Sequence, residues 1–420
     1  MIRDLKNNLM LRNFSSLTII QISNYIFPLI TFPYLVRVLG PEKFGLIHFA
    51  IAFIAYFGTL VDYGFTLSAT REISLHRENK EELSKIFSSV IIIKLMLVVL
   101  SIFILIPVVS VFSKFSDNSL VYYLTFISVI GQALYPIWFF QGIEQMKYLL
   151  YITVSSKAAS VVLIFILVTS PDHLLTVIII NSGAALLMGL SGIIVVVFHF
   201  KIRLKLQSSS LLKYHFFEGG YIFLSTAAIN IYTTTNIFLL GIFTNDSIVG
   251  YFSAADKIRI AVQSTFSTIS QTIYPRLSKQ FEESKREAVK FVGKILYGVG
   301  SLVFILCLII VIFAKDIIAV ILGPGYEPSV ILLQILGFLP FIIFLSNISG
   351  IQTMLNLGYK KEFTKILAQA ALLNTLLALV LIQLFAATGT AVSMLITEIF
   401  VTVSMIIFLN KKEIKIFGHV

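Results

Sequence analysis

The stretch that decides the fold reads Val90-Ile-Ile-Ile-Lys-Leu-Met-Leu-Val-Val-Leu-Ser-Ile-Phe-Ile-Leu-Ile-Pro-Val-Val109, and Lys94 is its one charged residue. An α-helix needs about 20 apolar residues to cross the hydrocarbon core of a bilayer. The whole chain has a similar composition, since 57% of its 420 residues are hydrophobic and 13% are charged. Soluble domains carry about 25% charged residues. The composition therefore excludes a soluble enzyme and predicts a polytopic membrane protein.

Twelve apolar stretches of this kind are separated by clusters of glycine, proline or charge. They cover residues 12–36, 44–66, 86–112, 119–141, 149–169, 174–200, 212–242, 248–274, 290–314, 329–355, 363–386 and 389–409. The expected fold is therefore an all-α integral membrane protein with 12 transmembrane helices. The single cysteine, Cys307, excludes an internal disulfide and a cysteine-based metal site.

The distribution of lysine and arginine predicts the orientation of these spans. If the N-terminus is cytoplasmic, the termini and even-numbered loops hold 24 of the 32 basic residues, and the odd-numbered loops hold 4. Cytoplasmic loops of membrane proteins carry an excess of lysine and arginine. We therefore expect both termini to be cytoplasmic, and this asymmetry accounts for most of the net charge of +11 without a nucleic-acid partner.

The two halves of the chain align at a single offset of 205 residues. The segment from Gly45 to Arg71 matches the segment from Gly250 to Arg276, with a glycine at the start of an apolar span and an arginine 26 residues later. Six spans in each half give a parallel repeat, with its axis along the membrane normal. We expect one six-helix bundle over residues 1–205 and a second over residues 206–420.

Several motifs resemble the polysaccharide-biosynthesis exporters. They are Tyr34-Leu-Val-Arg-Val-Leu-Gly-Pro-Glu-Lys-Phe-Gly45, Asp62-Tyr-Gly-Phe65, Ala69-Thr-Arg-Glu-Ile73 and Gln141-Gly-Ile-Glu-Gln-Met-Lys147. The nearest group is the O-antigen flippases of the Wzx type. They belong to the multidrug/oligosaccharidyl-lipid/polysaccharide exporter superfamily, which also holds the multidrug/toxin extruders and the lipid II flippase. The resemblance covers nearly the whole chain.

This resemblance implies a fold, a substrate and a location. It implies a V-shaped pair of six-helix bundles around a central cavity in the bacterial inner membrane. It also implies translocation of an undecaprenyl-diphosphate-linked oligosaccharide from the cytoplasmic to the periplasmic leaflet by alternating access. The expected partners are this lipid-linked glycan, membrane lipid, a glycan polymerase and a chain-length regulator, with no nucleic acid.

Ionisable residues inside the predicted spans are candidate functional residues, because a charge at the centre of a span costs about 2.5–3.5 kcal/mol. They are Lys94, Lys157, Lys257, Arg259, Asp62, Asp256 and Glu398. A diphosphate requires point charges or an arginine fork, so we assign Lys157, Lys257, Arg259, Lys94 and the nearby Arg37 to its binding. Two alternatives remain open: Asp256 and Arg259 neutralise each other at i and i+3, and Arg37 is an interfacial snorkelling residue.

Polar residues recur on one face of the eighth span, at Asp256, Arg259, Gln263, Ser267, Ser270 and Tyr274. Sugar hydroxyls need donors and acceptors when they leave water, so such faces are expected to line a path for glycans. The proposed lining residues are Asn24, Thr31, Asn230, Thr234, Gln263, Ser267 and Ser270. The alternative is that these groups join helices to one another within the bundle.

The energy source is expected to be an ion gradient or the membrane potential, because the chain has no Gly-x-x-x-x-Gly-Lys-Ser/Thr motif for ATP. Asp62, Asp256 and Glu398 are the candidate carriers of H⁺ or Na⁺, and no other cofactor is expected. Two other functions stay open. One is a cation-coupled multidrug/toxin exporter of the same superfamily. The other is a membrane glycan polymerase or acyltransferase, which the short odd-numbered loops disfavour.

Overall fold

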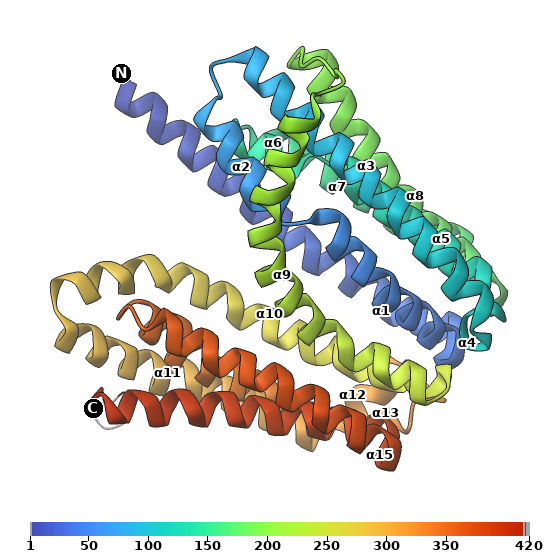
Figure 1. Cartoon of the computed structure of the whole chain (residues 1–420). Helices are drawn as coiled ribbons and strands as arrows, with labels where there is room; N and C mark the ends of the chain where they lie inside the picture. Colours follow the sequence, from blue (N-terminus) through green and yellow to red (C-terminus); the bar gives the residue numbers. More distant parts are fainter. Residues whose placement is uncertain (1, 415, 417–420) are drawn as a thin grey trace. The chain divides into compact units, whose positions relative to one another are not determined.

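A computed structural model describes residues 2–414 and 416 of the chain, and for residues 2–11, 221, 224–226, 228–233, 267–269, 271 and 272 it describes the backbone alone. The described residues form helices and contain no strand, which confirms the all-α class (Figure 1). The α-helices are α1 (Ile2–Asp62), α2 (Phe65–Leu75), α3 (Lys80–Val111), α4 (Ser113–Ser116), α5 (Ser119–Leu134), α6 (Ile137–Gly142), α7 (Met146–Leu167), α8 (Leu174–Ile194), α9 (Ser209–Phe243), α10 (Asp246–Glu283), α11 (Lys285–Ile312), α12 (Ala314–Ile321), α13 (Ser329–Leu336), α14 (Leu339–Ser349) and α15 (Lys360–Lys411). Short 3₁₀ and π-helical pieces are η1 (Pro171–His173), η2 (Val195–His199) and η3 (Gly350–Leu355).

Eight helical segments among the described residues are long and apolar enough to cross a membrane. Two of these segments each contain two predicted spans, and in both segments the helix is interrupted where one span ends and the next begins. The backbone leaves the helical conformation at Gly40 in α1 and at Ala386 in α15. The predicted spans 212–242 and 248–274 lie on α9 and α10. Each of the twelve predicted spans therefore lies mainly on helical backbone in the described part of the chain, although short breaks at residues 63–64, 135–136 and 337–338 interrupt three of them.

Helix α3 shows how the sequence divides a span into two faces. Met96, Val99, Leu100 and Phe103 recur at helical spacing and are 58%, 51%, 48% and 72% exposed. An exposed apolar stripe of this kind is typical of a lipid-facing surface and unusual for a soluble protein. The opposite face carries Lys94, which is 1% exposed, so the one charge of this span points away from the lipid-facing stripe.

The chain divides into two compact units. Unit 1 consists of Met1–Leu39 and Ile47–Thr234, and unit 2 consists of Gly40–Leu46 and Thr235–Val420. Helix α9 therefore contributes to both, and a short piece of α1 belongs to unit 2. The two units are defined by which residues pack together, whereas the boundary between residues 205 and 206 was placed from the sequence repeat. That boundary therefore stays a prediction.

Each unit has its own apolar core. In unit 1 the aromatic rings of Phe49, Phe53 and Tyr122 pack together, with ring centroids 5.9 Å apart for Phe53 and Tyr122. In unit 2 the core is formed mainly by α10, α11, α14 and α15 and includes the fully buried Cys307 and Met354. These cores fix the helices that carry the polar residues described next.

Candidate functional site

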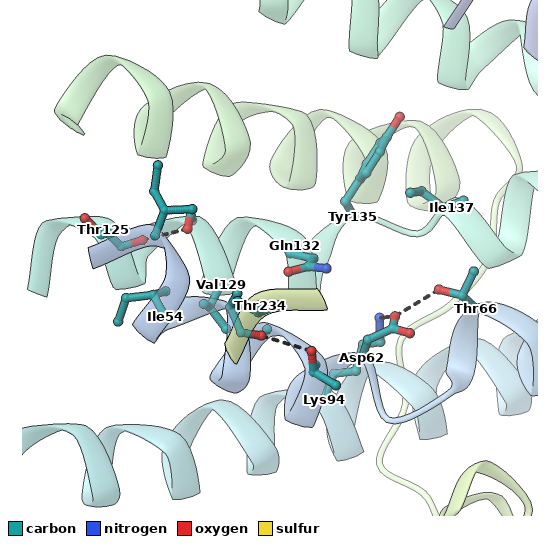
Figure 2. Close-up of a pocket in the computed structure, with 15 residues that line it drawn as sticks. Ile54, Asp62, Thr66, Lys94, Thr125, Val129, Gln132, Tyr135, Ile137 and Thr234 are labelled. Carbon is teal, nitrogen blue, oxygen red and sulfur yellow. Dashed lines mark hydrogen bonds and ion pairs between the residues drawn. The ribbon is translucent and has the colours of Figure 1, made fainter. Parts of the chain in front are cut away.

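A polar cavity of about 440 Å³ lies inside unit 1. Its polar lining comes from helices α1, α2, α3, α5 and α9 and from the residue after α5. The polar lining residues are Thr59, Asp62, Thr66, Lys94, Thr125, Ser128, Gln132, Tyr135 and Thr234 (Figure 2). Hydroxyl and amide groups of this kind can donate hydrogen bonds to a solute and accept them from it. The cavity is therefore equipped for a hydrated or hydroxyl-rich ligand.

The turn from α1 into α2 positions Asp62 at this cavity. Asp62 is the last residue of α1, and the next two residues, Tyr63 and Gly64, have φ of 49° and 75°. These left-handed angles end α1 before α2 begins at Phe65, and glycine adopts such a conformation at no steric cost. Thr66 in the first turn of α2 then donates a hydrogen bond to Asp62 Oδ1 at 2.9 Å (Figure 2). The sequence Asp62-Tyr-Gly-Phe65 thus builds one corner of the site.

Lys94 is the partner of Asp62, and its Nζ lies 3.3 Å from Asp62 Oδ1. The two side chains differ in their access to solvent, since that of Lys94 is 2% exposed and that of Asp62 is 27% exposed. Burying an ion pair is tolerated only with a close partner and further hydrogen bonds, which Asp62 and Thr66 provide. The ammonium group is consequently held by the carboxylate of a residue that lines the cavity.

The structure brings together two further predicted residues, Lys157 and Asn24. Lys157 Nζ donates a hydrogen bond of 2.6 Å to Asn24 Oδ1, which joins α7 to α1 within unit 1. Lys157 is half-buried, and an amide oxygen leaves its positive charge uncompensated. The arrangement keeps a cation available for an anionic group.

In unit 2, three side chains on the polar face of α10 bond to one another along the helix. Arg259 Nε donates to Asp256 Oδ1 at 2.6 Å, and its Nη1 donates to Gln263 Oε1. Both charged residues are buried, at 7% and 8% exposure. The i,i+3 neutralisation that the sequence left open is therefore present.

Further along α10, Ser270 is buried in a seam between helices. Its hydroxyl donates to Asn347 Oδ1 on α14, and Gln352 Nε2 of η3 donates to the Ser270 carbonyl at 2.9 Å. Ser278 donates to Asn356 Oδ1 at 2.7 Å in the same seam. This part of the polar face joins α10 to α14 and η3, as in the packing interpretation of the stripe.

The remaining predicted residues with described side chains lie on α1, α10 and α15. Arg37 is exposed on α1, Lys257 is half-buried on α10 beside the Asp256–Arg259 pair, and Glu398 lies on α15. Thr31 is 8% exposed and its hydroxyl donates to the Phe27 carbonyl of its own helix at 3.2 Å. The predicted side chains of Asn230 and Ser267 lie outside the described residues.

The sequence analysis did not assign two sets of polar residues that the structure brings together. Gln132 and Tyr135 line the unit 1 cavity, and the amide of Gln132 inside an apolar span was a usable signal. In unit 2, Asn374 donates to Asn236 Oδ1 at 3.0 Å and accepts from Thr397 at 3.3 Å, with all three residues buried. These three residues come from distant segments, so no local pattern joins them.

Among the described residues, no cluster of His, Cys, Asp and Glu could hold a metal ion.

The chain is similar to known proteins over nearly its whole length. Residues 10–281 match the model of the family described as "Polysaccharide biosynthesis protein". A relative from Escherichia coli strain K12, named "Putative O-antigen transporter", is 36% identical over 96% of this chain and 97% of its own length. A protein of the same name from Shigella dysenteriae is 30% identical over 94% of this chain and 99% of its own length.

Two solved structures share the fold. The lipid II flippase MurJ in an inward closed conformation has a TM-score of 0.65 at 15% identity, covering 96% of this chain and 89% of that chain. A multidrug resistance MATE family transporter of the MOP superfamily, inward-facing, has a TM-score of 0.64 at 13% identity, covering 92% of this chain and 94% of that chain. At these identities the likeness concerns the fold alone.

Proposed function

The chain belongs to the polysaccharide biosynthesis protein family, and from this premise we propose that it is a flippase for an undecaprenyl-diphosphate-linked oligosaccharide. The substrate is an O-antigen repeat unit, which the protein moves by alternating access from the cytoplasmic to the periplasmic leaflet of the bacterial inner membrane. The single observation that carries the proposal is the 36% identity to a protein named as an O-antigen transporter, over nearly the full length of both chains. The termini lie in the cytoplasm, in line with the excess of basic residues on that side.

The polar residues of unit 1 fit the glycan part of this substrate. Sugar hydroxyls that leave water need hydrogen-bond partners, and the cavity supplies threonine and serine hydroxyls together with the amide of Gln132. The cavity of about 440 Å³ has room for part of an oligosaccharide rather than for a whole repeat unit. It is therefore proposed to contact the sugars as they pass.

The diphosphate is proposed to interact with Lys157 and Lys257. Lys94 and Arg259 are already held by the carboxylates of Asp62 and Asp256, at 3.3 Å and 2.6 Å. Lys157 has an amide as its hydrogen-bond partner, and Lys257 lies beside a carboxylate that Arg259 occupies. Arg37 is proposed to receive the head group on the periplasmic side.

Ion coupling is proposed to use Asp62 ahead of Asp256 and Glu398. Asp62 is the acidic residue that lines the unit 1 cavity, and its side chain is 27% exposed. A carboxylate in contact with water can exchange H⁺ or Na⁺ with it. The glycan polymerase and chain-length regulator of the same pathway are the proposed protein partners.

The proposal is tested in a strain that lacks its own flippase and makes O-antigen of the matching type. Wild-type protein should restore the lipopolysaccharide ladder, whereas Lys157→Ala and Lys257→Ala should abolish it at normal protein level, with partial rescue by arginine. Lys361→Ala, which removes an exposed lysine, is the matched control and should leave the ladder unchanged. A full ladder with both alanine variants would overturn the assignment of the head group.

A second measurement separates this function from drug export. Cells that express the protein should show unchanged susceptibility to cationic drugs, and reconstituted protein should move a lipid-linked oligosaccharide between leaflets. Increased drug resistance without any ladder would favour the multidrug exporter.

A further inference from the structure

The connection between α8 and α9 carries a concentration of positive charge. It reads Lys201-Ile-Arg-Leu-Lys-Leu-Gln-Ser208, and we call residues 201–208 the linker segment. Three of its first five residues are cations, and the sequence has no aspartate or glutamate between Asp172 and Glu218. Because the linker segment joins two predicted spans within a few residues, it lies close to the surface of the bilayer.

Hydrogen bonds fix the linker segment to helix α3. Arg203 N donates to Ser84 Oγ at 3.2 Å, and Lys205 N donates to Ser88 Oγ at 3.1 Å. Ser88 Oγ in turn donates to the Arg203 carbonyl at 3.2 Å. The two serines are one helical turn apart, a rise of about 6 Å, which is also the span of about two extended residues. The backbone between these bonds is therefore extended, and successive side chains point to opposite sides.

The apolar side chains of the linker segment pass from buried to exposed along the chain. Ile202 is 1% exposed, Leu204 is 50% exposed and Leu206 is 95% exposed. Ile202 therefore anchors the segment in unit 1, whereas Leu206 stands clear of the protein. Removal of a leucine side chain from water is favourable, and the hydrocarbon of the adjacent bilayer is an apolar phase that can accept it.

The cations of the linker segment differ from other basic residues on the same predicted side of the membrane. Arg77 pairs with Glu144 at 2.9 Å, and Lys85 pairs with Glu82 at 2.9 Å. The three cations of the linker segment are exposed, and in the described part of the chain they form no ion pair. They are therefore available to a partner that carries negative charge.

We propose that the linker segment binds anionic phospholipid of the bilayer. Its three cations contact the phosphate groups, and Leu206 enters the acyl region beside them. Clusters of lysine and arginine next to a span attract anionic lipid, and apolar contact adds to this attraction. The serines of α3 position the backbone so that charged and apolar side chains reach different depths of the bilayer. In the orientation proposed above, this is the cytoplasmic leaflet.

The first experiment measures which lipid the purified full chain retains. Native mass spectrometry is applied to protein in micelles that contain equal amounts of phosphatidylglycerol and phosphatidylcholine with the same acyl chains. Wild-type protein should retain phosphatidylglycerol in preference. The triple variant Lys201→Gln/Arg203→Gln/Lys205→Gln should reduce the ratio of bound phosphatidylglycerol to phosphatidylcholine about fivefold or more, because each cation near an anionic surface contributes roughly that factor.

The matched control removes three exposed cations from the start of α15, as Lys360→Gln/Lys361→Gln/Lys365→Gln. It should keep the preference of the wild type. An excess of glycerol phosphate, which has the phosphate without acyl chains, should also leave the ratio unchanged. Equal ratios in the two triple variants, or displacement of phosphatidylglycerol by glycerol phosphate, would overturn the proposal.

A second variant keeps all three charges and removes their support. Ser84→Ala/Ser88→Ala deletes the hydroxyls that bond the backbone of the linker segment, so it should lower the preference by part of the loss in the triple variant. Ser101→Ala is its control, because that hydroxyl bonds the Leu97 carbonyl of its own helix at 2.7 Å. An unchanged ratio in the double variant would overturn the positioning by α3.

The insertion of Leu206 is measured with a fluorophore. Leu206→Cys in the Cys307→Ser background is labelled with bimane and reconstituted in vesicles that contain lipids with brominated acyl chains, which quench it. Quenching should be stronger in phosphatidylglycerol than in phosphatidylcholine. It should also be several-fold stronger than at Gln207→Cys, because the next side chain of an extended segment points to the other side. Equal quenching at both positions would contradict the insertion.

These readouts use no glycan and are therefore independent of the proposed transport. A preference for phosphatidylglycerol in a protein that never restores the lipopolysaccharide ladder would support the lipid site and overturn the flippase function. A restored ladder without any lipid preference would do the reverse.

Discussion

Units 1 and 2 each bury an acid–base pair in a predicted span, and the two pairs differ in how they meet water. In unit 1, Asp62 and Lys94 are 32 residues apart, and the carboxylate side chain is 27% exposed at a polar cavity. In unit 2, Asp256 and Arg259 are one helical turn apart, and their side chains are 10% and 9% exposed. An ion pair of the same kind is thus accessible to water in unit 1 and enclosed among buried side chains in unit 2. Access to water, rather than charge, distinguishes a coupling candidate from a structural pair.

The largest expected effect is that of Asp62→Ala, which leaves the buried ammonium of Lys94 without its carboxylate. Removal of one partner from a buried ion pair costs about 3–5 kcal/mol. We expect a loss of this size in the free energy of unfolding in mixed micelles. Lys94→Ala should cost less, because Asp62 remains in contact with solvent.

The double variant Asp62→Ala/Lys94→Ala is the control for this comparison. It removes both charges, so it should be more stable than Asp62→Ala alone. If all three variants lose the same stability, the pair is not the stabilising contact and the contrast between the units fails.

A smaller effect is expected for Asp256→Asn. The amide oxygen can still accept from Arg259, so the change weakens a charge-assisted hydrogen bond without removing it, at a cost of about 2 kcal/mol. Gln263 continues to hold the guanidinium. Thermal unfolding of the purified variant checks this. A loss larger than that of Asp62→Ala would reverse the proposed ranking of the two pairs.

Gln352→Ala tests the uncharged part of the unit 2 network. Gln352 Nε2 donates to the carbonyl and to the hydroxyl of Ser270, both at 2.9 Å. Loss of neutral hydrogen bonds of this kind costs about 1 kcal/mol. Thr265→Ala, whose exposed hydroxyl bonds its own helix at 3.3 Å, is the control and should cost little. Equal melting temperatures for the two variants would show that the seam adds no stability.

The smallest effect is expected for Gly183→Ala in α8, which gives a baseline for the others. Nothing lies within 4 Å of the added methyl group, and alanine is favoured over glycine inside helices by about 0.5–1 kcal/mol. The variant should therefore be as stable as the parent or slightly more stable. Gly131→Ala, where the methyl group would meet the backbone of Ala185 and Leu186 at 2.3–2.5 Å, should lose stability in the same assay. A loss in Gly183→Ala would show that the baseline is not neutral.

Local chemistry made part of the site predictable. Lys94 stood out as one charge in an apolar stretch, and Asp256 and Arg259 stood one turn apart, so their mutual neutralisation was a stated alternative. The partner of Lys94 was not predictable, because Asp62 lies on another helix. The burial of Ser270 against Asn347 and Gln352 was likewise hidden, because a polar stripe on a helix has the same spacing whether it faces water or a neighbouring helix.

The sequence by itself determined the helices, the predicted spans, the charges inside those spans and the offset between the halves. Hydropathy and periodicity are properties of neighbouring residues, and a bilayer requires every backbone group of a span to be satisfied within its own helix. Only the tertiary structure decided that Asp62 holds Lys94, that Asn24 holds Lys157 and that Gly45 packs against α10. These contacts join segments far apart in the chain, and they depend on packing among helices that no local pattern encodes.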